Sequence, residues 1–181
     1  ANDGVIDFAT NTINGEGTGS NTESLTLTSG AGTITLGTVG GSTGLDSFVV
    51  NASALTISND ITTANGLIDI NAPVSLGGDV VLSSGTGTGN IEFSSTIDGT
   101  QDLTLSSGSG AITVTGDIGA GTALTSLTIN AQNSETSSGK ITLTGDIGDD
   151  VAAGVTGVTK IGNSATTEIQ LGGTLYRTGG A

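Results

Sequence analysis

The chain is short of several residue types, and each shortage excludes a class of site or partner. It contains no cysteine, histidine, methionine or tryptophan, so neither disulfides nor thiolate metal sites contribute to it. Only three residues are basic (Lys140, Lys160 and Arg177), whereas 17 are acidic, and the net charge is −14. Because three basic residues cannot form a phosphate-binding surface, we expect no nucleic acid among the partners. The same deficit argues against binding to anionic membranes.

Long apolar runs are also missing. No stretch approaches the roughly 20 apolar residues that span a bilayer, so we expect no insertion into a membrane. The first residues, ANDGVIDF, contain neither the basic nor the apolar segment of a secretion signal. We therefore expect the chain to be a mature product or a segment excised from a longer one.

The residues that are abundant favour strands and turns. Only 34% of the chain is apolar, against roughly 45–50% in ordinary globular domains. Thr, Ser, Gly, Ile, Val and Leu dominate; Thr, Ile and Val suit a pleated surface, and Gly supplies turns. Two-residue alternation recurs along the chain, and no window shows a sustained helical period. This predicts an all-β protein, and the regular spacing of Ile, Leu and Val argues against disorder.

One unit repeats along the sequence. LTLTSGAGTITL at 25–36 and LTLSSGSGAITV at 103–114 are nearly the same, and VVLSSGTGTGNIEF at 80–93 follows the same plan with two extra residues. Each unit is an alternating run, a Gly/Ser turn and a second alternating run, followed by a lone aliphatic residue and a Gly-rich segment of variable length. Constant strands joined by variable loops are typical of a solenoid.

These repeats predict a parallel β-solenoid of about 24–29 residues per coil, hence about six to seven irregular coils over residues 1–181 as a single domain. Aliphatic side chains face inward, and Thr, Ser, Asp or Glu face outward. Residues 55–82 depart from the pattern and predict a tighter coil with short turns around Pro73. Val5–Phe8 and 169–171 look like ordinary rungs, without the helix or polar segment that usually caps a solenoid. We therefore expect either a piece of a longer rod or copies that stack end to end.

The segment 89–131, with its I-x-F/V strand, I-D-G or D-I-G turn and L-T-L run followed by S/N-x-G, resembles the repeats of filamentous-haemagglutinin-like giant bacterial surface adhesins and related β-strand-repeat exoproteins. The resemblance covers most of the chain and is poorest over 55–82. It implies a right-handed parallel β-helix, export to the bacterial cell surface, and a role as a rod or adhesin that contacts cell-surface or matrix components. It transfers no catalytic residue.

Carboxylates provide the main alternatives to a purely structural role. Polysaccharide-active β-helices need clustered carboxylates in a groove, and Asp98, Asp102 and Asp117 are candidates together with the group at 146–150. Histidine is absent, and aromatic residues for stacking on sugars are nearly so, and we therefore expect no enzyme. Turns rich in Asp and Gly also offer oxygen ligands for calcium. The calcium candidates are Asp146, Asp149 and Asp150, although their spacing does not match a known calcium loop, and solvated turns are the favoured explanation.

Outward threonines raise one further class of function. Thr-x-Thr pairs at 33–35, 113–115 and 142–144 are interpreted as one strand type, which would stack into the flat threonine ladder of an ice-binding solenoid. Thr is also a common outward residue on any strand, and Asp69 and Glu92 occupy equivalent positions in other coils. The sequence therefore predicts a non-enzymatic extracellular rod. The main alternative is a self-assembling fibre subunit that stacks end to end, and an ice-binding or polysaccharide-active solenoid ranks below both. Its expected partners are neighbouring repeats or copies of itself.

Overall fold

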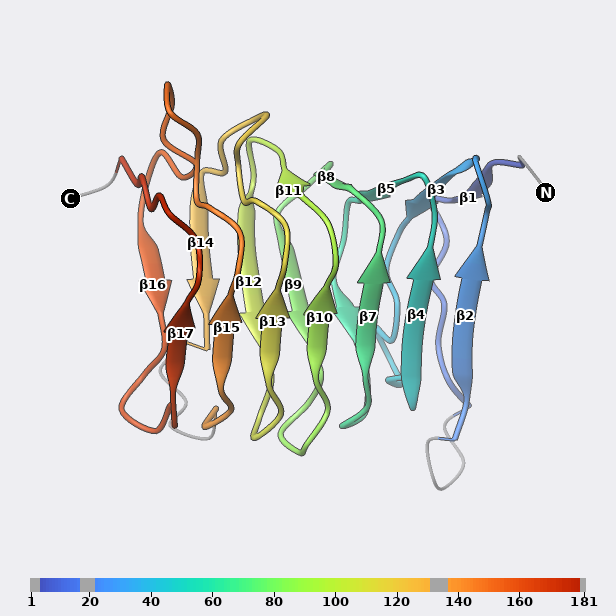
Figure 1. Cartoon of the computed structure of the whole chain (residues 1–181). Coiled ribbons are helices and arrows are strands. Elements are labelled where there is room, and N and C mark those ends of the chain that lie inside the picture. Colours follow the sequence, from blue (N-terminus) through green and yellow to red (C-terminus); the bar gives the residue numbers. More distant parts are fainter. Residues whose placement is uncertain (1–3, 17–21, 131–136, 180–181) are drawn as a thin grey trace.

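The computed structural model describes residues 4–16, 22–130 and 137–179. These residues form 17 short strands and no helix, and the strands pair only in parallel (Figure 1). Parallel pairing between strands that are distant in sequence means that the chain winds repeatedly around one axis. The all-β parallel solenoid expected from the repeats is confirmed.

Three sheets run along the rod, and we call them A, B and C. Sheet A consists of β1 (Ile6–Phe8), β3 (Thr33–Leu36), β5 (Ala54–Ile57), β8 (Val74–Leu76) and β11 (Ile97–Asp98). Sheet B consists of β6 (Ile61–Thr62), β9 (Val80–Ser83), β12 (Asp102–Ser106), β14 (Ser126–Ile129) and β16 (Thr159–Ile161). Sheet C consists of β2 (Ser24–Thr28), β4 (Ser47–Asn51), β7 (Ile68–Asn71), β10 (Ile91–Phe93), β13 (Ile112–Val114), β15 (Ile141–Leu143) and β17 (Ile169–Leu171).

The chain visits the sheets in the fixed order A, B, C. In Figure 1 the strands of sheet C lie in front, those of sheet B lie behind them with the opposite direction, and sheet A closes the top of the view. The turns from sheet B to sheet C gather at the bottom. Seven strands spaced about 4.8 Å apart make sheet C a ladder roughly 29 Å long.

The number of turns is slightly lower than the sequence suggested. Sheets A and B have five strands each, so the rod has about five turns rather than six to seven. The two numbers differ because, toward the ends of the rod, isolated β-bridges of one residue pair take the place of strands in sheets A and B. Sheet B is continued by the bridges of Ile13 with Val39 and of Val39 with Ile61, and sheet A by Ile118, Ile147 and Tyr176. Apolar spacing alone cannot separate such a one-residue bridge from a strand.

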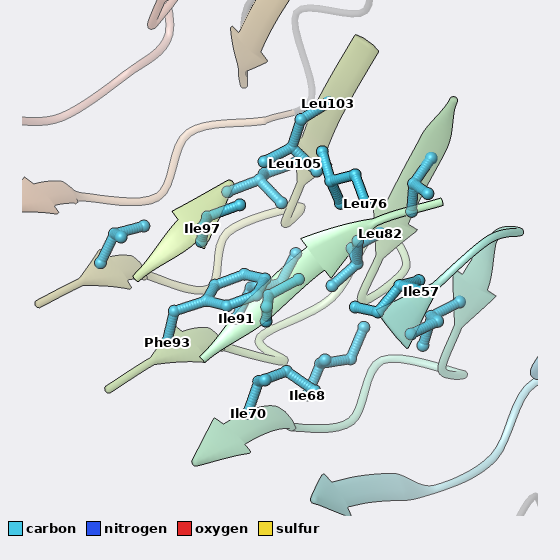
Figure 2. Packing of buried hydrophobic residues seen from close by; sticks show 14 of the residues in the cluster. Ile57, Ile68, Ile70, Leu76, Leu82, Ile91, Phe93, Ile97, Leu103 and Leu105 are labelled. Atoms are coloured by element: carbon cyan, nitrogen blue, oxygen red, sulfur yellow. The ribbon is translucent and has the colours of Figure 1, made fainter. Parts of the chain in front are cut away.

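The interior is filled by aliphatic side chains stacked in register. In sheet C, Ile91 pairs with Ile68 on one side and with Ile112 on the other, and all three are fully buried. Figure 2 shows how Ile91 and Phe93 meet side chains of the other two sheets across the narrow core. Each buried Ile or Leu contributes about 1.5–3 kcal/mol, so one or two inward side chains per strand stabilise a chain of low apolar content.

The stretch 55–82 is the tighter coil expected from the sequence. It passes through strands of all three sheets, from β5 to β9, with short connections. Pro73 is exposed immediately before β8. Proline lacks an N–H, but its carbonyl still accepts a hydrogen bond from the backbone N–H of Leu55 in the preceding turn (2.9 Å).

The two nearly identical units occupy different sides of the rod. The unit at 25–36 runs from β2 in sheet C to β3 in sheet A, whereas the unit at 103–114 runs from β12 in sheet B to β13 in sheet C. The same twelve-residue pattern therefore fits two different corners. The sequence pattern of a strand therefore does not determine which of the three sheets the strand joins.

Candidate functional site

A buried hydroxyl closes the corner within each repeated unit. The Ser107 hydroxyl donates to the carbonyl of Gly110 (2.7 Å), and the Ser29 hydroxyl donates to the carbonyl of Gly32 (2.7 Å). The same bond joins Ser84 with Gly89 (2.6 Å) and Thr63 with Gly66 (2.7 Å). All four hydroxyl-bearing residues are buried. Sequence analysis placed these serines in Gly/Ser turns without assigning them a role, although a Ser or Thr three residues before a Gly marks three of the four corners.

Glycines at the corner from sheet B to sheet C form a column in which successive turns touch backbone to backbone. A Cβ on Gly110 would overlap the carbonyl oxygen of Gly89, and a Cβ on Gly139 would overlap that of Gly110. A Cβ on Gly89 would in turn overlap Gly66. Each of these glycines stands two residues before an inward Ile of sheet C, so the pattern G-x-I marks the corner. Only a residue without a side chain allows the turns to approach to this distance.

Asn130 extends the polar interior of the same corner by one turn. It is buried and has a left-handed backbone (φ 45°). Its amide nitrogen donates to the Ser107 hydroxyl oxygen (3.1 Å), and its amide oxygen accepts from the backbone N–H of Ser107 (2.8 Å). Asn tolerates this backbone conformation better than most residues. The side chain thus satisfies the buried backbone N–H and hydroxyl oxygen of Ser107.

Outward carboxylates hold the backbone of the following turn. Asp60 accepts from the N–H of Val81, and Asp79 accepts from the N–H of Asp102. Further along the rod, the same role falls to Asp98 with Gly121 and Thr122, to Asp117 with Asp146, and to Asp146 with Thr174 and Leu175. The donor lies 21 to 29 residues after the acceptor, one turn further on. Of these, Asp98, Asp117 and Asp146 are among the carboxylates that the sequence offered to an enzyme, and each accepts a hydrogen bond from backbone one turn on. Asp102, another of those candidates, accepts instead from the Ser126 hydroxyl (2.8 Å).

The side-chain hydrogen bonds between turns have a common direction. Within the described residues the donor lies in the later turn and the acceptor in the earlier one, with the single exception of the Ser107 N–H that donates to Asn130. The side-chain bonds therefore give the stack of turns a direction. The backbone bonds between turns run both ways, since the Phe48 N–H donates to Leu67 in the next turn and the Gly37 N–H donates to Phe8 in the preceding one.

Two of the three calcium candidates are engaged with backbone N–H groups. The N–H groups of Leu175 and Thr174 donate to the Asp146 carboxylate and lower its pKa below the ordinary value of 3.8. The N–H groups of Ala152 and Val151 donate to the Asp149 carboxylate and lower its pKa in the same way. Hydrogen bonds to the charged form of a carboxyl have this effect because they stabilise the anion.

The three candidates do not converge. Asp146 reaches toward the following turn, Asp149 closes its own loop, and Asp150 is exposed beside it. In the part of the chain that the structure describes, no three acidic side chains come together in a way that would hold a metal ion. The calcium hypothesis therefore gains no support from the geometry and stays a prediction to be tested.

The threonine pairs lie on two different sheets, which corrects their interpretation as one strand type. Thr33 and Thr35 belong to β3 in sheet A, whereas Thr113 and Thr142 are register partners in sheet C. The sequence alone could not assign these pairs to different sheets, because β3 and β13 each form the second strand of a copy of the same repeated unit. The outward column of sheet C contains, in order along the rod, Thr26, Val49, Asp69, Glu92, Thr113, Thr142 and Gln170. A two-strand threonine patch with a carboxylate on one side is not the long flat ladder that the ice-binding hypothesis requires.

The C-terminal end of the described rod exposes side chains that are interior elsewhere. Ile169 and Leu171 of β17 occupy the inward positions of sheet C yet are 45% and 50% exposed. Lys160, the outward residue of β16 in sheet B, is also exposed. The only ion pair among the described residues is that of Lys140 with Glu168, whose charged atoms are 3.3 Å apart.

Comparison with family models, curated proteins and solved structures finds no match to this chain. The described residues also contain no helix long and apolar enough to cross a membrane. The resemblance to bacterial surface adhesins thus rests on the repeat sequence, and the function has to be argued from the geometry.

Proposed function

We propose that the chain is a non-enzymatic structural rod of an extracellular bacterial surface protein. The observation that carries this proposal is the continuity of the three parallel ladders along the axis, which enclose an aliphatic interior in the described turns. Ladders of this kind resist bending because every turn is hydrogen-bonded to both neighbours.

The polar residues fit the same role. Asp60, Asp79, Asp98, Asp117 and Asp146 tie each turn to the next through backbone N–H groups. A catalytic carboxylate needs freedom to reach a substrate proton or carbon, whereas these side chains are occupied by backbone donors. The variable loops at the edges of the sheets are the places where contacts to cell-surface or matrix components would be built.

The proposed position at the cell surface can be tested on the bacterium that produces the chain. Antibodies raised against the 181-residue chain are applied to intact and to permeabilised cells. We expect labelling of intact cells; labelling that appears only after permeabilisation would refute the surface assignment. In a second assay, beads coated with the chain are added to matrix-coated slides and to host cells. Retention by either surface identifies adhesion, while a lack of retention on both limits the role to that of a spacer.

A further inference from the structure

The chain contains two asparagines that are directly followed by glycine. Asn14 precedes Gly15 in the segment before β2, and Asn65 precedes Gly66 at the corner from β6 in sheet B to β7 in sheet C. Both asparagines are exposed. In such a pair the backbone nitrogen of the glycine can attack the side-chain amide carbon of the asparagine, because the two groups are neighbours and glycine has no side chain to hinder the approach.

The two pairs differ in the state of the attacking nitrogen. The N–H of Gly15 donates to the carbonyl of Thr43 (3.1 Å), so that this hydrogen bond must break before the nitrogen can attack. The N–H of Gly66 donates to no carbonyl or side chain among the described residues. The nucleophile is therefore held back in the first pair and available in the second.

We propose that Asn65 is a site of self-modification, at which the side-chain amide is converted into a carboxylate. The Gly66 nitrogen forms a bond to the amide carbon of Asn65, and the bond from that carbon to the amide nitrogen breaks. The amide nitrogen leaves as ammonia and takes up the proton of the Gly66 N–H. Water then opens the resulting cyclic imide. Opening at the side-chain carbonyl gives aspartate, and opening at the main-chain carbonyl gives isoaspartate.

The following turn of the rod assists the first step. The N–H of Gly87 donates to the amide oxygen of Asn65 (2.7 Å). Negative charge develops on this oxygen when the nitrogen attacks, and a donor that is already in place stabilises it. A Cβ on Gly85 would stand only 2.7 Å from the same oxygen, so the absence of a side chain there lets the turn approach. Asn14 has a comparable donor in the N–H of Ser42 (3.0 Å), which leaves the attacking nitrogen as the difference between the pairs.

The two products fit the corner differently. Aspartate keeps an oxygen that accepts from the N–H of Gly87. Isoaspartate adds one carbon to the main chain, at a corner where a Cβ on Gly66 would overlap the carbonyl oxygen of Asp46 and a Cβ on Gly89 would overlap that of Gly66. A longer main chain has no room between these turns. The modification thus adds negative charge to an acidic rod, and its isoaspartate product opens one corner. This inference does not depend on the proposed rod function.

Peptide mass spectrometry on the full chain tests the selectivity. The chain is incubated in neutral buffer, either folded or in concentrated urea, and the conversion of each pair is followed with time; labelling by an isoaspartate methyltransferase is the second readout. In the folded chain Asn65 should convert about tenfold faster than Asn14, because the hydrogen bond of Gly15 opposes attack. In urea the two rates should be similar. Equal rates in the folded chain, a faster Asn14, or conversion of Asn65 only in urea would overturn the proposal.

Two matched variants identify the source of the signal. Asn65→Gly removes the amide and accepts the left-handed backbone at this position (φ 69°). The folded Asn65→Gly chain should lose most of the isoaspartate labelling, whereas Asn14→Gly should keep it; the opposite result would refute the assignment to Asn65. Asn65→Asp should unfold at a thermal midpoint close to that of the natural chain, and the isoaspartate fraction of aged chain should unfold at a lower one. Equal midpoints for the two would refute the predicted opening of the corner.

Discussion

Asp69 and Glu92 are register partners on β7 and β10, so that two carboxylates lie side by side on the outer face of sheet C. Neighbouring amides turn them in opposite directions along their strands. Asn71, two residues after Asp69, donates to it (2.9 Å), and Asn90, two residues before Glu92, donates to that carboxylate (3.1 Å). The two asparagines hold the like charges apart, although Coulomb repulsion between adjacent strands still opposes pairing.

Removal of one of these charges should stabilise the rod. Glu92→Gln keeps an acceptor for Asn90 and is expected to raise the free energy of unfolding by about 0.5 kcal/mol at low salt, with a smaller gain at high salt because screening already weakens the repulsion. Urea denaturation at two salt concentrations measures this change in the free energy of unfolding. Asp7→Asn is the matched control, since Asp7 faces Thr35 rather than an acid. An equal gain from both variants would mean that overall charge, not the pair, is responsible.

The buried corner hydroxyl makes a larger contribution. Ser107→Ala removes the donor to Gly110 and the partner of the Asn130 amide, which leaves buried polar groups unsatisfied. We expect a loss of about 2 kcal/mol in the free energy of unfolding. Ser106→Ala, one residue earlier on the outward face, should change it by less than about 0.5 kcal/mol. Similar losses for the two variants would contradict the assignment of Ser107 to the corner.

The glycine column should not tolerate a methyl group. In Gly110→Ala the new Cβ would overlap the Gly89 carbonyl oxygen, so successive turns must separate. We expect a loss of at least about 2 kcal/mol, seen as a lower midpoint in thermal unfolding followed by far-UV circular dichroism. Gly172→Ala is the control, because its Cβ would stand 3.5 Å from the nearest atoms, an ordinary contact. A normal midpoint for Gly110→Ala would disprove the close approach of the turns.

Acid should weaken the tie between the last two turns. The pKa of Asp146 is lowered in the folded chain, first by the N–H of Leu175 and then by that of Thr174. A lowered folded pKa means that the stabilisation is fully present above the ordinary value of 3.8 and is lost as the pH falls through the folded pKa. Natural chain and Asp146→Asn should therefore differ in stability at neutral pH and converge in acid. Carbon NMR of the Asp146 carboxyl should give a midpoint below 3.8; a midpoint above it would contradict the structure.

Calcium should act on this chain only through its charge. The carboxylates of Asp146 and Asp149 already accept backbone hydrogen bonds, and Asp150 stands alone beside them. We expect calcium and magnesium at equal ionic strength to raise the thermal midpoint equally, by screening of the net charge. A midpoint that rises with calcium alone, and that loses this dependence in Asp150→Asn, would establish a specific site at 146–150.

The sequence predicted the interior of the rod better than its corners. Alternation identified inward residues such as Ile91 and Ile112 because a strand period of two has a direct physical cause. It could not assign strands to sheets, since LTL at 25–27 and at 103–105 has the same period on different sides of the rod. The bend between strands depends on turn geometry, which short Gly/Ser segments do not encode in their hydrophobicity.

The polar contacts were the least predictable part. A serine in a Gly-rich turn is usually solvated, so nothing in its type announced that Ser84 would be fully buried. The acids were similar: Asp98 and Asp117 were weighed as carboxylates of a polysaccharide-active groove. Their role depends on the turn that stacks above them, 23 and 29 residues away, and no local pattern reaches that far.

The outward column of sheet C has one further consequence. Its members change from threonine to valine, to acids and to an amide, while the side chains behind them remain aliphatic or aromatic. Shape and surface character are thus encoded at alternate positions of the same strands. Mutation can change what this outer face presents to its surroundings without touching the residues that make the chain fold, so the surface can diversify while the rod stays the same.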